Sequence, residues 1–283
     1  MSNNSAKELL EQALLAQWSH FGNSTEGGLE DDGELVWTES PFRHLPYNAV
    51  LKARIGKNAA QRVQSQIERF KQRQVHFMWV VTPSARPENI EQILVDAGLS
   101  LITREIGMIA ELHNPEEGLA WEYRDVTYII AENAKDIADF ESLTMAYWDL
   151  PGEMREYVHA FTWRAFTAGN CGFFFLAYLG SKPVGKAYLS MLGDAGCSSL
   201  WAVFVKPEAR GLGIGSHLTR LVLQHAQKIG RRKVALMSTE MGRPVYERHG
   251  FQTVCQIPVY ADTPTLSTLQ GVQTPSAAKV VRQ

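Results

Sequence analysis

The sequence predicts an α/β fold with a mixed sheet, in which one arrangement of strands and helices occurs twice. Three observations lead to this expectation. Apolar strands alternate with amphipathic helices along the chain, residues 203–229 are typical of a strand, a glycine-rich loop and a one-faced helix, and two distant segments repeat the same order of motifs. A chain of 283 residues is long enough for one large or two ordinary domains.

The first half of the chain is predicted to begin with a helix and a Gly/Asp/Glu-rich loop. We expect, in order, a helix near 5–21, strands near 34–38 and 49–55, a helix over 59–72, a strand at 77–82, a short helix at 87–97 and a strand at 100–112. Residues 113–125 contain Pro115 and Gly118 and are typical of a linker. We therefore place a linker at 115–125, between domains of residues 1–114 and 126–262.

The second half is predicted to be a complete α/β domain. We expect a strand at 126–131, helices from Asn133 to 147 and from Pro151 to 166, strands at 172–179 and 184–192 around a turn at 180–183, a strand at 199–205, a helix to 229, a strand at 234–238, a helix near 244–249 and a strand at 251–260. Residues 263–283 are polar and rich in Thr, Pro and Ser, which predicts a flexible tail.

Two segments repeat the order strand, Arg-Pro, helix, Gly-hydrophobe, strand. The first contains Arg86-Pro87 and ends at Gly98-Leu99, and the second contains Arg243-Pro244 and ends at Gly250-Phe251. This pattern favours a degenerate first copy of the second domain, with an unrelated α+β cap as the alternative. The turn at 54–59 of the first copy has no run of glycines, so we do not expect it to hold a pyrophosphate.

The segment Val203–Gly215 predicts an anion site. Gly211, Gly213 and Gly215 carry no Cβ, so the backbone can adopt unusual angles and a ligand can approach it closely. The helix that follows presents unpaired N–H groups and the positive end of its dipole, and phosphate is the usual occupant of such a site. The spacing does not fit Gly-x-Gly-x-x-Gly, and no Gly-Lys-Ser/Thr follows, which disfavours a Rossmann oxidoreductase and excludes a P-loop.

These residues and the segment after them resemble the GNAT superfamily of acyl-CoA N-acyltransferases. The resemblance is carried by Val205-Lys-Pro207, by Arg210-Gly-Leu-Gly-Ile-Gly215 and by Gly242-Arg-Pro-Val-Tyr246-Glu-Arg-His-Gly250-Phe251, and it covers roughly residues 126–260. It implies a GNAT fold, arranged as tandem copies of which the first is degenerate. The family's final strand is not visible in the sequence, so it is either absent or supplied from elsewhere in the chain.

The resemblance also implies a reaction and its residues. Acetyl-CoA would be the co-substrate, with its pyrophosphate on the glycine loop and its pantetheine arm along the preceding strand edge. Tyr246 would be the general acid that protonates the leaving thiolate. The residues expected to bind the co-substrate are Val203, Phe204, Val205, Arg210, Gly211, Leu212, Gly213, Ile214, Gly215 and Ser216.

The acceptor and the general base stay open. Strand 234–238 offers no carboxylate, and we leave Glu240, Asp149, Glu153, Glu156, a water chain or a weakly basic amine as alternatives. The acceptor site is expected between the first two helices of the second domain and the sheet, among Tyr147, Trp148, Met154, Tyr157, Phe161 and Trp163. We expect an N-acetyltransferase acting on a primary amine of a small molecule or peptide. The alternative is a non-catalytic acyl-CoA-binding regulatory module.

Composition narrows the remaining classes. The net charge of -2 gives no reason to expect nucleic acid or an anionic membrane as a partner. Cys171, Cys197 and Cys255 lie far apart, so neither a disulfide nor a metal site is expected. The polar N-terminus and the short apolar runs predict a cytoplasmic protein without a secretory signal or membrane span. We expect the protein to be a monomer or a homodimer.

Overall fold

The computed structural model describes residues 2–23, 28–112, 125–192 and 196–262. Its described strands form one mixed sheet of eleven strands in the order β1-β2-β3-β4-β11-β5-β10-β9-β8-β7-β6. The fold is therefore the expected mixed α/β type.

The helices and strands follow the predicted order closely. In the first half they are α1 (Asn3–Asn23), β1 (Leu29–Asp31), β2 (Leu35–Thr38), β3 (Ala49–Ala53), α2 (Ala59–Gln72), β4 (Met78–Val80), α3 (Ile90–Asp96) and β5 (Ser100–Glu111). In the second half they are β6 (Val126–Ile130), α4 (Ala134–Trp148), the one-turn helix η1 (Gly152–Met154), α5 (Arg155–Thr167), β7 (Gly172–Leu179), β8 (Lys182–Ser190), β9 (Cys197–Val205), the one-turn helix η2 (Pro207–Ala209), α6 (Ile214–Lys228), β10 (Lys233–Ser238), α7 (Arg243–Glu247) and β11 (Gln252–Ala261).

The chain divides into two compact units that exchange segments. Of the described residues, the first unit contains those within 1–11, 18–106 and 255–283, and the second contains those within 12–17 and 107–254. Strands β5 and β11 each contribute residues to both units. The core of the first unit lies between α2 and strands β2–β4, where Val63, Phe70 and Trp79 are fully buried. The core of the second unit includes Phe140, Leu143 and Leu176 from α4 and β7.

The second half of the sequence lacks the final strand of its domain, and strand β5 from the first half lies in the sheet beside β10 instead. Within the second unit, the end of β5 lies beside β10: the Leu112 amide donates to the Arg232 carbonyl at 2.8 Å, and Lys233 pairs with Glu111 at 3.5 Å. Within the first unit, β11 pairs antiparallel with β4, with Tyr260 opposite Trp79. Each unit therefore contains a strand that comes from the other half of the sequence.

Two local predictions were wrong. Residues 29–31 form strand β1, although a loop was expected there, because the Asp32 carboxylate accepts the amides of Glu34 and Leu35 and Gly33 adopts a φ of 87°, which turns the chain into an antiparallel hairpin. Strand β8 begins at Lys182, two residues before the predicted start, because a bulge lets Pro183 lie opposite Tyr178. The predicted linker, apart from Asp125, and the predicted tail lie outside the described residues.

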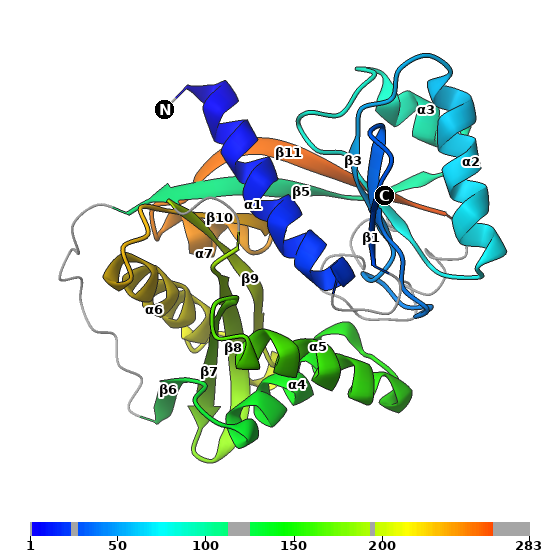
Figure 1. The fold of residues 1–283 in the computed structure, drawn as a ribbon. Coiled ribbons are helices and arrows are strands. Elements are labelled where there is room, and N and C mark those ends of the chain that lie inside the picture. Colours follow the sequence, from blue (N-terminus) through cyan, green and yellow to red (C-terminus); the bar gives the residue numbers. More distant parts are fainter. Residues whose placement is uncertain (1, 24–27, 113–124, 193–195, 263–283) are drawn as a thin grey trace. The chain divides into compact units, whose positions relative to one another are not determined.

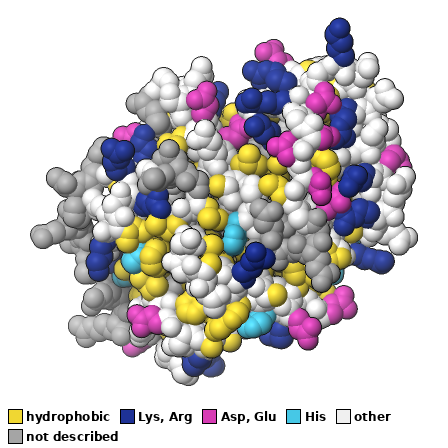
Figure 2. All heavy atoms as spheres, in the orientation of Figure 1, with side chains coloured by type: hydrophobic (Ala, Val, Ile, Leu, Met, Phe, Trp, Pro, Cys, Tyr) yellow, Lys and Arg dark blue, Asp and Glu magenta, His cyan; other side chains and the backbone are white. Residues whose placement is uncertain are grey.

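The surface carries both signs of charge. Lys, Arg, Asp and Glu side chains are interspersed on the face drawn in Figure 2. Among the helices that the structure describes, none combines the length and the apolar character that a membrane crossing requires.

Candidate active site

Strand β9 carries a bulge close to its end. Its register against β8 changes between Trp201 opposite Tyr188 and Phe204 opposite Lys186, so Ala202 and Val203 together oppose Ala187. Ala202 adopts a φ of 53°, which is unusual for a residue with a side chain. A bulge leaves backbone groups outside the ladder and redirects them, as often occurs beside active sites.

The edge of β9 toward β10 opens before this bulge. The two parallel strands pair over three residues, from Cys197 opposite Lys233 to Ser199 opposite Ala235. No further pairing of these two fully described strands extends to Val203–Val205. The strand edge that the sequence analysis assigned to the pantetheine arm is therefore open in the second unit.

The glycine loop lies between β9 and α6, after the one-turn helix η2 (Figure 1). Gly211 and Gly213 have φ values of 80° and 72°, and Gly213 is the N-cap of α6. A Cβ added at either position would meet nothing within 4 Å. Within the part of the chain that the structure describes, the amides of residues 211–216 donate to no protein acceptor outside the helix. Free donors around an open space at a helix start fit a phosphate group.

Three of the residues predicted to bind the co-substrate have different positions in the site. The Phe204 side chain is buried and packs on Tyr147 of α4, with ring centroids 5.3 Å apart, so only its backbone faces the open edge. Arg210 is exposed and its Nε donates to the Val205 carbonyl at 3.2 Å, which orients the loop. Ile214 is buried and anchors the first turn of α6.

Helix α7 brings Tyr246 to the same region of the second unit. The Tyr246 ring packs edge-on against Phe251, with centroids 5.7 Å apart. Three residues after Tyr246, His249 approaches the loop, and its Nε2 lies 2.7 Å from the Ser216 Oγ. This hydrogen bond joins the glycine loop to the helix of the predicted acid, so the two sequence motifs meet in space.

The corresponding place in the first unit is filled by its own chain. Strands β3 and β4 pair at Ala49 and Val50, and beyond that point the Arg86 backbone pairs with β3 through bonds to the Ala53 carbonyl and the Ile55 amide at 2.9 and 3.0 Å. Before α2, the Glu34 carboxylate accepts the Gly56 amide at 3.0 Å. An internal strand segment and an internal carboxylate thus occupy the positions that stay open in the second unit.

The predicted acceptor region is well packed. Met154 and Tyr157 are buried, and Tyr147 and Trp163 pack against the core of the second unit. Among the alternatives for the base, Glu240 is exposed and pairs with Arg243 at 3.4 Å.

A carboxylate and imidazole pair on α4 and α5 was missed by the sequence analysis. Glu141 is buried, and its Oε1 lies 3.0 Å from Nδ1 of the exposed His159. Burial raises the pKa of Glu141, which the hydrogen bond from His159 counteracts. The two residues stand on different helices, so sequence spacing alone gave no sign of the pair.

Lys186 is the second feature that the sequence analysis missed. Its side chain is 1% exposed, its Nζ lies 2.5 Å from the Thr144 Oγ1 and 4.4 Å from the centroid of the Phe140 ring. Burial lowers the pKa of Lys186 to about 7, because the charged form loses its hydration. The residue stands opposite Phe204 of β9 in the sheet register, beside the predicted cofactor strand.

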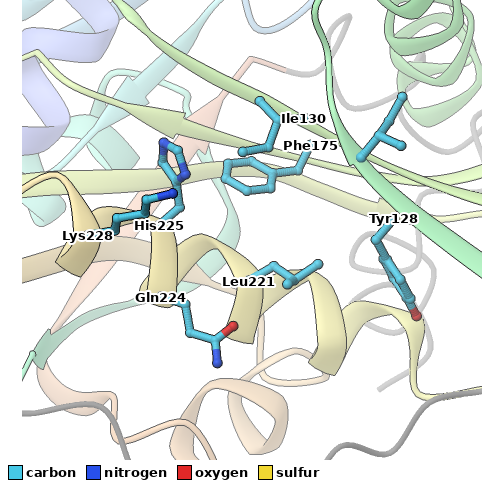
Figure 3. A pocket seen from close by; sticks show the side chains of 8 residues that line it. Tyr128, Ile130, Phe175, Leu221, Gln224, His225 and Lys228 are labelled. Carbon is cyan, nitrogen blue, oxygen red and sulfur yellow. The ribbon is translucent and has the colours of Figure 1, made fainter.

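A hollow of about 260 Å³ runs along the C-terminal half of α6. Figure 3 shows Lys228 and His225 at one end and Tyr128 of β6 at the other, with Phe175 between them. It lies beyond the glycine loop along the helix and is lined mainly by apolar groups.

An open strand edge followed by a free glycine loop and a tyrosine helix is the arrangement expected of an acyl-CoA N-acyltransferase domain. Residues 137–251 match the sequence profile of the Acetyltransferase (GNAT) family.

Parts of the sequence and the overall fold are also similar to known proteins. Over 86 residues the chain is 36% identical to mycothiol acetyltransferase of Geodermatophilus obscurus, an alignment that covers 28% of each protein and therefore well under two thirds of that relative. A GCN5-related N-acetyltransferase from Kribbella flavida has a similar fold, with a TM-score of 0.64, 16% identity and coverage of 89% of this chain and 95% of that one. A tandem GNAT protein from the clavulanic acid biosynthesis pathway matches 92% of this chain and 96% of its own, with a TM-score of 0.59 and 13% identity.

Proposed function

We propose that this chain transfers an acetyl or other acyl group from acyl-CoA to a primary amine of a small molecule or peptide. The observation that carries the proposal is the second unit's open strand edge and free amide cradle, which contrast with the filled positions of the first unit. Acyl-CoA supplies the activated thioester. Gly211–Ser216 would hold its pyrophosphate through backbone amides, and Val203–Val205 would pair with the amides of its pantetheine arm.

The backbone near the bulge has the chemistry to stabilise developing negative charge. Attack by an amine on a thioester places charge on the carbonyl oxygen, and an amide that is held outside the ladder can donate to it. Ala202 and Val203 are the residues at which β9 leaves its regular register, so we assign the oxyanion donor to this part of the strand.

Tyr246 is the proposed general acid. As the C–N bond forms and the C–S bond breaks, the leaving sulfur must gain a proton, and the phenol of Tyr246 can donate it because a phenol keeps its proton until charge develops nearby. The acceptor ammonium must lose a proton before its nitrogen can attack the thioester.

A non-catalytic acyl-CoA-binding module is the alternative, and it is favoured by the absence of a carboxylate on β10. Calorimetric titration with acetyl-CoA, desulfo-CoA and NADH, followed by a thiol-release screen against amines, separates the two. We expect micromolar binding of both CoA compounds and none of NADH, with amine-dependent thiol release that falls in Tyr246→Phe. Binding without amine-dependent release supports the module, and absence of CoA binding overturns both.

A further inference from the structure

A cluster of basic side chains lies beside the first two turns of α6. It consists of His217 and Arg220 on α6, and of Arg248 and His249 directly after α7. We call these four residues the basic cluster. Arg248 is exposed and the other three are half-buried, so all four side chains are accessible from solvent.

Short contacts hold His217, Arg220 and His249 of the cluster in place, and Arg248 lies near enough to His249 for its charge to act on it. The His249 Nε2 lies 2.7 Å from the Ser216 Oγ, and the Arg220 Nη2 lies 3.2 Å from the His217 Nδ1. The Tyr128 ring stacks on the His217 ring, with centroids 4.0 Å apart and an angle of 13° between the planes. Because Ser216 is the last residue of the amide cradle, the cluster continues directly from the predicted pyrophosphate site.

The electrostatics of His249 show that positive charge is concentrated there. Burial is the main reason that its pKa lies below the usual range, and the charges of Arg248 and Arg220, together with His217, lower the pKa further. Cations that oppose protonation of a neighbouring imidazole are close enough to attract an anion at the same place.

Coenzyme A carries a second anionic group near its pyrophosphate. This is the 3′-phosphate monoester, which stands on the same ribose that bears the pyrophosphate chain. Arginine side chains match the geometry of phosphate oxygens, and charge-assisted hydrogen bonds to phosphate are stronger than neutral ones. We propose that the basic cluster, with Arg220 and Arg248 as its main donors, binds the 3′-phosphate of coenzyme A and so distinguishes coenzyme A from its dephospho form. This inference rests on the proposed function, because it extends the same co-substrate site.

The test compares two ligands that differ only in this phosphate. Dissociation constants of coenzyme A and 3′-dephospho-CoA are measured by calorimetry for the wild type, Arg220→Gln and Arg248→Gln. We expect the wild type to bind coenzyme A about 10- to 100-fold more tightly, which corresponds to about 1.4 to 2.8 kcal/mol. Each variant should reduce this preference at least threefold and leave dephospho-CoA affinity within twofold of wild type.

Lys228→Gln is the matched control. Lys228 is an exposed cation on α6, like Arg220, but it lies at the end of the hollow opposite Tyr128, which stacks on His217 of the basic cluster (Figure 3). It should leave the preference unchanged. Arg248 is exposed, so its replacement tests the inference even if Arg220→Gln unfolds the domain. Equal binding of both ligands by the wild type, or a preference that neither arginine variant reduces, overturns the 3′-phosphate site while the proposed function stands. Absence of binding by either ligand overturns both.

Discussion

Lys186→Met tests how burial controls the charge of the lysine beside the proposed cofactor strand. Burial lowers the pKa of Lys186 from 10.5 to about 7. At about 1.4 kcal/mol for each pKa unit, keeping this amine in the folded state costs at most about 5 kcal/mol. Methionine has a similar shape without the charge. It loses the Thr144 hydrogen bond and the contact with the Phe140 ring, which contribute about 1 kcal/mol each. We expect the free energy of unfolding at pH 7 to rise by about 2 kcal/mol. The variant no longer has the energetic cost of burying the amine, and this cost is larger than the stabilisation lost with the two contacts.

The pH dependence gives the same test a second readout. The folded pKa lies below the unfolded pKa, so between about pH 7 and 10.5 the unfolded chain binds more protons at Lys186. The wild type should therefore gain stability from this residue as the pH rises through that window, by about 1.4 kcal/mol for each pH unit, and Lys186→Met should not. Urea unfolding between pH 7 and 9.5, followed by tryptophan fluorescence, measures both effects.

Lys182→Met is the control, because Lys182 is an exposed lysine on the same strand. It should change neither the stability at pH 7 nor its slope with pH. The reasoning is refuted if Lys186→Met is less stable than the wild type at pH 7. It is also refuted if the difference between the two proteins stays constant from pH 7 to 9.5.

Three further predictions concern the proposed site. Gly213→Asp should abolish acetyl-CoA binding in a calorimetric titration, and retained affinity would contradict the assignment of the pyrophosphate to this loop. Gly230→Asp is the control, because Gly230 has a similarly positive φ of 82° and equally open surroundings. Both variants should lose about 1–2 kcal/mol of stability, but Gly230→Asp should still bind acetyl-CoA. The same titration of the wild type should give one acetyl-CoA per chain, because Arg86 and Glu34 fill the positions of the first unit; a stoichiometry of two would refute this. Tyr246→Phe should lower kcat for thiol release about 100-fold and change acetyl-CoA affinity less than twofold, and an unchanged kcat would remove Tyr246 as the acid.

Much of the fold was predictable because local signals were strong. Strand β7 has the predicted bounds of 172–179, and Asn133 caps α4 by accepting the Asp136 amide at 3.1 Å. The loop signal was also local, since glycines at 211 and 213 take the positive φ values that their residue type allows. An Asp-Gly pair at 32–33 would have indicated the missed hairpin before β2.

The exchange of β5 and β11 was not predictable, because an apolar strand does not encode which neighbour it pairs with. The filled position in the first unit depends on Glu34 and Arg86, which meet the loop and β3 only in the folded chain. Lys186 was hidden for a different reason. Strand β8 is buried on both faces from Val184 onward, so no alternation of polar and apolar residues marked the lysine.

Hydrogen exchange with and without acetyl-CoA tests the central claim most directly, because it follows both units in one experiment. If the second unit holds the co-substrate, amides in residues 203–216 should gain protection on addition of acetyl-CoA, and amides in residues 54–58 should not. Protection at 54–58, or an unchanged exchange rate throughout 203–216 at saturating acetyl-CoA, would contradict the account.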